Sequence, residues 1–302
     1  MAIPYDFFQK VEQNLKYVIY GDTDSLYISI PQIKTDNKNE MYEKTKEISI
    51  EINDNIKGYL DKILLPKMGI DPIYNQTKFK TELVADAMVL IDVKKNYAYR
   101  MLVDEGKILD KPKVKFTNLA VTRSDIPKFT KEFISRIVSD ILFSPNYNPL
   151  SVKKDITDLA IEMRTKLRNL LNNYEYETIS TPKKWNTGYD NDPWQVLAMK
   201  LYNTLVNKDI FKPMSGGMIL PLKVENYTDL QHKIDPIKNN SPFFINNDPV
   251  IKIERIAIPY NYEKETIDAI FKHYKINIDL EECWDKLYNK TARRIVEISG
   301  VI

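Results

Sequence analysis

Apolar and polar positions near the start of the chain form two short runs around a polar centre. Residues 17–20 and 26–30 are rich in β-branched and aromatic side chains, and the stretch Gly-Asp-Thr-Asp-Ser at residues 21–25 separates them. Two such runs on either side of a polar turn are typical of a β-hairpin. The pattern therefore predicts a hairpin whose tip carries Asp22 and Asp24.

The segment that follows has helical periodicity. Between residues 39 and 65, apolar side chains recur at every third or fourth position with Glu and Lys between them, and Pro66 comes next. This spacing predicts an amphipathic helix that Pro66 ends. Strand-like composition then predicts strands at residues 79–83, 87–93 and 97–103, with a turn at residues 104–107.

Beyond Pro112 the chain becomes mostly helical. Residues 114–121 indicate one more strand, and Ser124 or Asp125 is expected to cap a helix that runs to about residue 143. Further helices are predicted up to about residue 172 and at residues 194–206, 263–274 and 280–295, with strands at residues 218–224 and 251–258. We predict an α+β fold in two parts, residues 1–110 and 111–302.

Overall charge excludes a strongly basic or acidic protein, but the charge is unevenly distributed. The chain of 302 residues has 44 Lys and Arg against 42 Asp and Glu, a net charge of +2. Between residues 111 and 140 there are seven Lys and Arg against three Asp and Glu, an excess of four. Such a local excess can hold a nucleic-acid backbone, although charged helices are also commonly just solvated.

The sequence also limits compartment and metal type. A single cysteine, Cys283, cannot form an internal disulfide, and no segment has the apolar length of a signal peptide or membrane span. We therefore expect a cytoplasmic protein without a membrane partner. His232 and His273 fit no ligand spacing and make no zinc site with Cys283.

Asp22 and Asp24 are the first candidates for chemistry. Two carboxylates one residue apart at a hairpin tip repel each other unless a cation lies beside them. Mg²⁺ prefers such oxygen ligands and often completes its shell with substrate phosphates. The pair therefore favours phosphoryl transfer, with a solvated polar turn as the alternative.

The residues around this pair match a known motif. The sequence Tyr-Gly-Asp-Thr-Asp-Ser at residues 20–25 resembles the motif that family B DNA polymerases carry on a hairpin of the palm. The resemblance implies that Asp24 is a direct ligand of two catalytic Mg²⁺ ions. It implies a weaker or indirect role for Asp22.

Two later segments fit the same family. Val-Lys-Lys-Asn-Tyr-Ala at residues 93–98 is similar to the family's Lys-Lys-Arg-Tyr-Ala motif, which contacts the primer end, and so implies DNA contacts for Lys94, Lys95 and Tyr97. Asn96 stands where the motif has Arg, which weakens a phosphate contact there.

Glu82 lies where the family has a strand bearing a glutamate near the metals, so it is a candidate third carboxylate. The alternative is that Glu82 is simply an exposed residue of a strand.

The second part resembles the thumb of the family, closest to the polymerases of T-even-type bacteriophages. The resemblance rests on Arg-Ser-Asp at residues 123–125 and on short matches further along the chain. It implies that residues 1–110 are the C-terminal part of the palm and that residues 111–302 are a mostly helical thumb. The expected duplex contacts are Lys113, Lys115, Arg123, Lys128 and Lys131.

The resemblance begins late in the architecture of the family. Only 21 residues precede Asp22, too few for the exonuclease, the fingers and the palm strand with the other metal-binding aspartate. We therefore expect a split polymerase, with a second chain that carries these parts and shares the two-metal Mg²⁺ site. An excised fragment of a longer polymerase is the alternative. Primer-template DNA and deoxynucleoside triphosphates are the expected ligands. A sliding clamp is another partner in this family, but the C-terminal residues lack the usual aromatic peptide. A phage-encoded chain would act in the host cytoplasm.

Three other interpretations compete with this one. A haloacid-dehalogenase-like phosphotransferase has a similar Asp-x-Asp motif, but here Leu26 occupies its Thr position and a strand follows at once. Reverse-transcriptase and RNA-polymerase palms also use paired aspartates, without this hexad and the Lys-Lys-x-Tyr strand. A non-catalytic DNA-binding or scaffold subunit derived from a polymerase would keep the fold, and Asn96 favours it slightly.

Overall fold

The computed structural model describes most of the first 183 residues and parts of the remainder. The described residues are 18–21, 25–78, 80–91, 95–183, 217–224, 244–245, 248–249, 255–259, 262–273 and 275–289, with Ala198, Tyr202 and Ile295. They fall into two compact units. The first consists of the residues up to Asp86 with Arg100–Lys113, and the second of Ala87–Tyr99 with the residues from Val114 on. Helices and antiparallel strands are both present, which confirms the α+β class.

The first unit begins with the predicted hairpin. Strands β1 (Val18–Gly21) and β2 (Leu26–Ile28) pair antiparallel, with Tyr20 opposite Tyr27 and Gly21 opposite Leu26. The two tyrosine rings contact each other across the hairpin, with centroids 5.9 Å apart. Aromatic cross-strand pairs of this kind stabilise a two-stranded ribbon. The hairpin expected from the sequence is confirmed.

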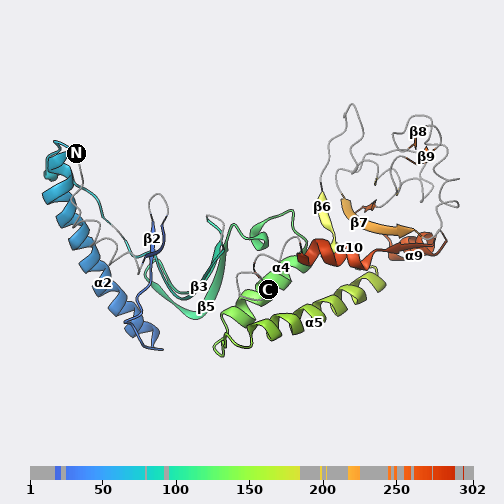
Figure 1. Cartoon of the computed structure of the whole chain (residues 1–302), viewed down its shortest axis with the longest axis horizontal. Helices are drawn as coiled ribbons and strands as arrows, with labels where there is room; N and C mark the ends of the chain where they lie inside the picture. The colour runs from blue at the N-terminus through green and yellow to red at the C-terminus, as the bar shows by residue number, and fades with distance from the viewer. Residues whose placement is uncertain are drawn as a thin grey trace. The chain divides into compact units, whose positions relative to one another are not determined.

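A long helix follows the hairpin (Figure 1). Helix α2 (Lys38–Tyr59) is capped by Asn37, whose side chain accepts hydrogen bonds from the backbone N–H groups of Asn39 and Glu40. It continues through a π turn, η1 (Leu60–Leu64), and a short helix, α3 (Leu65–Lys67). The predicted helix is confirmed, but the expectation that Pro66 ends it is wrong.

The π turn accounts for this continuation past proline. Proline disrupts a helix through its missing N–H and through a clash with the carbonyl four residues before it. In η1 the N–H of Leu65 donates to the carbonyl of Leu60, five residues back, so the turn before Pro66 is wider than in an α-helix. The chain then leaves the helix through Gly69 in a left-handed conformation, and a 3-10 turn, η2 (Pro72–Tyr74), follows.

Three strands form a meander in the order β3-β4-β5: β3 (Leu83–Leu90), β4 (Tyr97–Asp104) and β5 (Lys107–Thr117). β4 confirms the strand expected at residues 97–103. The expectation of separate strands at 79–83 and 87–93 is wrong, because one strand covers residues 83–90.

Asp86, where the apolar pattern breaks, accepts two hydrogen bonds from Arg100 on β4 at 2.8 and 2.9 Å. An ion pair between neighbouring strands thus keeps a polar residue within the strand. Residues 79, 92 and 93 lie outside the described residues.

The turn between β4 and β5 is tight. Glu105 and Gly106 both have positive φ, at 46° and 83°, as a type I′ turn requires, which confirms the turn expected there. β5 then begins at Lys107, earlier than the strand expected at residues 114–121, and residues Ala120–Thr122 form a 3-10 turn, η3. The first part of β5 is exposed at the edge of the sheet, where charged residues and Pro112 are tolerated.

Two glycines of the first unit allow a matched stability test. Gly106→Ala is expected to lower the free energy of unfolding by about 1 kcal/mol or more, because its φ is unfavourable for a side chain and the new Cβ would lie 3.1 Å from the Tyr42 hydroxyl. Gly58→Ala is expected to raise it by about 0.5–1 kcal/mol, because Gly58 lies within α2 and its Cβ would contact nothing within 4 Å. Urea unfolding of the two variants measures both effects. Equal effects of the same sign would contradict the turn geometry.

Helices build the first part of the second unit. They are α4 (Lys128–Arg136), which continues as the π turn η4 (Ile137–Leu142), then α5 (Val152–Asn172) and α6 (Tyr176–Ile179). The helices expected to about residues 143 and 172 are confirmed. The expected cap at Ser124 or Asp125 is wrong: the cap position is Pro127, and the Asp125 carboxylate binds Arg123 instead.

A small sheet and further helices complete the second unit. β7 (Gly217–Val224) pairs antiparallel with β6 (Thr181–Lys183), β10 (Arg255–Ile258) and β11 (Ile276–Ile278), and a separate pair consists of β8 (Phe244–Ile245) and β9 (Asp248–Pro249). The helical elements are α9 (Lys264–His273), α10 (Leu280–Trp284) and the π turn η6 (Asp285–Asn289).

These elements match most of the remaining expectations. β7 and α9 confirm the strand at 218–224 and the helix at 263–274, and β10 and α10 confirm parts of the elements at 251–258 and 280–295. Of the helix expected at 194–206, the structure describes Ala198 and Tyr202, both helical. The rest of that segment, residues 251–254 and most residues beyond 289 lie outside the described residues.

The two units differ in the size of their cores. In the second, α4, α5 and α10 pack around large buried side chains, and α5 runs beside α10 in Figure 1. Phe133 of α4 contacts the rings of Trp284 and Tyr288 at centroid distances of 6.1 and 5.4 Å. Among the described residues of the first unit, the buried hydrophobic side chains are Val84, Met101, Leu102 and Val103, and α2 has none.

Candidate functional site

The aspartate pair stands between the two strands of the hairpin in the sequence. Gly21 and Leu26 are opposite each other in the register, so residues 22–25 form the connection between the strands. A Cβ on Gly21 would lie 3.3 Å from the Leu26 side chain, a close approach that favours glycine before the first aspartate. Asp22 and Asp24 lie outside the described residues, so their metal-binding role stays a prediction.

Glu82, the candidate third carboxylate, is exposed just before β3. Its backbone carbonyl accepts a hydrogen bond of 2.7 Å from the N–H of Glu105, which fixes the backbone at this point. Within the described part of the chain, no group of three or more His, Cys, Asp or Glu side chains could hold a metal ion. Glu82 therefore belongs to no such group among the described residues, and a metal site of three carboxylates here would require Asp22 and Asp24.

The Lys-Lys-x-Tyr segment forms the connection from β3 to β4. Lys95 is exposed and has a positive φ of 70°, and the amide of Asn118 donates to its carbonyl at 3.3 Å. Tyr97 opens β4 and stacks on Tyr99, with ring centroids 6.1 Å apart. Lys94 lies outside the described residues. The segment thus presents Lys95 at a turn, with Tyr97 half-buried at the start of the neighbouring strand.

The lysines of β5 lie on the side of the strand opposite its packed residues. Val114 and Phe116 pack against the core of the second unit. Since side chains alternate along a strand, Lys113 and Lys115 point to the other face. Lys113 is exposed and Lys115 is partly exposed.

Arg123, Lys128 and Lys131 lie around the start of α4. Arg123 donates to Asp125 at 2.8 and 3.0 Å, and these hydrogen bonds to the carboxylate raise the pKa of the guanidinium. Lys128 is exposed in the first turn of α4, which contains no acidic residue. A helix N-terminus already carries positive potential, so Lys128 and Lys131 strengthen the attraction of this end for anions.

Part of the basic segment is used within the protein, a point that the sequence did not reveal. Arg136 of α4 forms a two-pronged ion pair with Glu162 of α5, and the bonded carboxylate raises the pKa of Arg136. Lys166 of α5 reaches back to Glu132. Arg136 thus joins two helices, so one cation of the basic segment is engaged within the protein, and one of its acidic residues, Glu132, is likewise paired.

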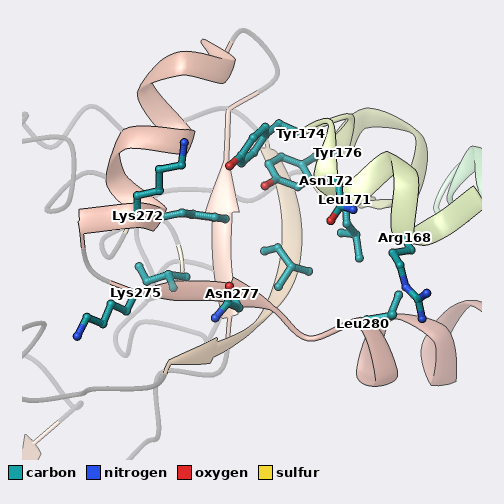
Figure 2. Close-up of a pocket in the computed structure, with 12 residues that line it drawn as sticks. Arg168, Leu171, Asn172, Tyr174, Tyr176, Lys272, Lys275, Asn277 and Leu280 are labelled. Carbon is teal, nitrogen blue, oxygen red and sulfur yellow. The ribbon is translucent and has the colours of Figure 1, made fainter. Parts of the chain in front are cut away.

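A hollow of about 620 Å³ lies in the second unit (Figure 2), lined by the ends of α5 and α9 and by β11. Its charged lining residues are Arg168, Lys272 and Lys275, and none of its lining residues is acidic. Lys272 and the hydroxyl of Tyr174 both donate to Asp268, and the hydrogen bond to Asp268 raises the pKa of Tyr174 to about 12. This lining cannot hold Mg²⁺, so the hollow is separate from any two-metal chemistry.

Cys283 is buried in α10 and does not provide a nucleophile. Burial raises the pKa of its thiol to about 12, so the thiol stays protonated at neutral pH. Among the described residues, no helix is long and apolar enough to span a membrane.

Comparisons with known proteins connect the chain to DNA polymerases. It is 26% identical over 237 residues to the DNA polymerase of Paramecium bursaria Chlorella virus NY2A, a match that covers 78% of this chain and 22% of the viral enzyme. It is 24% identical over 262 residues to the DNA polymerase of Pyrococcus horikoshii, which covers 83% of this chain and 18% of the relative. No family model matches. The chain is distantly related to DNA polymerases and spans about one-fifth of the length of these relatives.

Proposed function

We propose that the chain is the C-terminal part of the palm and the thumb of a family B DNA polymerase, and that it acts in DNA replication. The main support is the distant relationship to two DNA polymerases over about four-fifths of the chain. The hexad at residues 20–25 is further support, because the strands on either side of residues 22–24 pair as a hairpin. The likeness to T-even-type phage enzymes points further to a bacteriophage protein of the host cytoplasm.

The proposed chemistry is nucleotidyl transfer with Mg²⁺. The oxygen ligands at the hairpin suit this ion, and Asp24 would hold both metals, with Asp22 beside it and Glu82 as a third carboxylate. When bound, the metals would supply the positive charge that activates a primer 3′-hydroxyl and stabilises the leaving pyrophosphate of a deoxynucleoside triphosphate. Lys94, Lys95 and Tyr97 would hold the primer end.

The chain is proposed to act with a second polypeptide. About four-fifths of each relative lies outside the matched segment, and two-metal catalysis needs carboxylates from more than one segment. The first unit also has a small core of its own. We therefore propose a split polymerase whose other chain supplies the exonuclease, the fingers and the remaining palm. A sliding clamp is a further candidate partner.

Reconstitution tests this function. Co-expression with the polymerase polypeptide from the same genome that matches the remaining parts of the relatives is expected to give Mg²⁺-dependent primer extension. The chain alone is expected to give none. A stable complex that binds primer-template DNA without extending it would instead favour the non-catalytic scaffold, the alternative that Asn96 supports.

The duplex grip is proposed to come from lysines of β5 and α4. Lys113→Gln and Lys128→Gln, each tested separately in the complex, are expected to weaken duplex binding at low salt. Each change should also lower the slope of log affinity against log salt by about 0.9, the effect of one lost phosphate contact. Lys154→Gln on α5 removes the same charge from an exposed helix position and is the control. Unchanged slopes for both test variants would contradict these contacts.

A further inference from the structure

The end of the α2 helix and the residues after it expose a cluster of large apolar side chains. Ile73 and Tyr74 are 79% and 75% exposed, and Met68 is 62% exposed. Monomeric proteins seldom gather so many exposed apolar groups in one short segment. We call this cluster the α2-end surface, and its members are Ile63, Leu64, Met68, Ile70, Ile73 and Tyr74.

Local interactions hold this surface in a defined shape. The carboxylate of Asp71 accepts a hydrogen bond of 2.9 Å from the N–H of Ile73 and so caps the turn that presents Ile73 and Tyr74. The amide of Asn75 donates to Asp61 at 2.6 Å and ties the turn back to the helical segment. The apolar side chains are therefore held outward by ordered backbone.

The first unit does not cover this surface with its own described residues. Met41 and Tyr42, in the first turns of α2, pack against Val84, Leu102 and Val103. The other end of α2 extends away from the strands (Figure 1). Of the described large apolar side chains that are exposed, most belong to the first unit, although it is the smaller one.

The charges of the segment favour a protein as the occupant. Residues 61–74 contain two acidic side chains, Asp61 and Asp71, and two basic ones, Lys62 and Lys67, so their sum is zero. A nucleic acid would need a cationic surface to neutralise its phosphates. A neutral apolar surface instead resembles the centre of a stable protein interface.

We propose that the α2-end surface docks the polypeptide that supplies the rest of the polymerase. This inference rests on the proposed function, and the length of the relatives supports the choice of occupant: about four-fifths of each lies outside the matched segment. The surface belongs to the same unit as the hairpin that frames Asp22 and Asp24. Docking there would attach the missing carboxylates to the unit that carries this pair.

The test uses two double variants of the full chain. Ile73→Ser with Tyr74→Ser removes two side chains of the α2-end surface. Leu150→Ser with Tyr147→Ser is the control, because these side chains are also one aliphatic and one tyrosine, are 92% and 51% exposed, and belong to the second unit. Binding of purified polymerase polypeptide from the same genome is measured by titration calorimetry, and thermal unfolding verifies that both variants are folded.

Wild type and control are expected to bind alike, and the Ile73/Tyr74 variant at least about tenfold more weakly. Equal binding by all three proteins would overturn the proposal, as would the absence of binding by wild type. Analytical ultracentrifugation of the chain alone provides a second measurement. If the wild type and the control form a homodimer and the Ile73/Tyr74 variant does not, then a second copy of the chain occupies the surface, and the proposal is overturned. If the complex forms as expected but does not extend a primer, this result contradicts the proposed function and still supports the docking surface.

Discussion

Asp24→Ala is expected to abolish primer extension by the reconstituted polymerase while leaving the complex intact. A carboxylate that binds both metals contributes several kcal/mol to transition-state stabilisation, so the loss should be about 10³-fold or more. The measurement is single-turnover extension of a labelled primer over a range of Mg²⁺ concentrations. Asp22→Ala, with its weaker or indirect proposed role, is expected to lose less.

Asp54→Ala is the matched control for this experiment. Asp54 is an exposed acidic residue on α2, so its replacement removes the same charge from the same unit without changing the hairpin. It is expected to retain full extension. Extension at the wild-type rate by the Asp24 variant would reject the metal assignment, and dissociation of the complex would show a structural role instead.

Phe133→Ala is expected to lower the free energy of unfolding of the second unit by about 3–5 kcal/mol. Phe133 is 1% exposed and contacts both Trp284 and Tyr288, so its removal leaves a cavity where α4 meets the C-terminal helices. Such a change is a large part of the stability of a typical domain. Urea unfolding followed by tryptophan fluorescence measures it.

Leu150→Ala supplies the comparison for that variant. Leu150 is 92% exposed, so its replacement is expected to change stability by less than about 0.5 kcal/mol. A small effect at Phe133, similar to that at Leu150, would mean that α4 is not packed against the C-terminal helices as described.

Local patterns in the sequence predicted most elements, and two of the errors came from side-chain ion pairs that the apolar pattern does not show. The spacing of apolar residues was sufficient for α2 and α5, and the stretch Asp-Glu-Gly-Lys was sufficient for the turn at residues 104–107. Asp86 interrupts an apolar pattern and led to two expected strands, because its partner Arg100 is 14 residues away. Asp125 resembles a helix cap in sequence, but its carboxylate is occupied by Arg123.

For the candidate site, too, contiguous motifs were recognised from the sequence, whereas contacts between distant residues were not. The aspartate hexad is contiguous, so six neighbouring residues were enough to suggest a class of chemistry. The pairing of Arg136 with Glu162 joins residues 26 apart and removes one cation from the predicted DNA-binding segment. The exposed α2-end surface was also not foreseen, because apolar periodicity predicts which face of a helix seeks a partner but not whether the same chain provides it.

The burial of Cys283 makes the chain well suited to site-directed labelling. It is the single cysteine of the sequence, and its protonated, inaccessible thiol reacts slowly with maleimides near neutral pH. A cysteine introduced at an exposed position outside the α2-end surface, such as Leu150, can therefore carry a fluorophore or spin label without removal of the native thiol. Distances from that label to a labelled partner would then report the geometry of the proposed assembly directly.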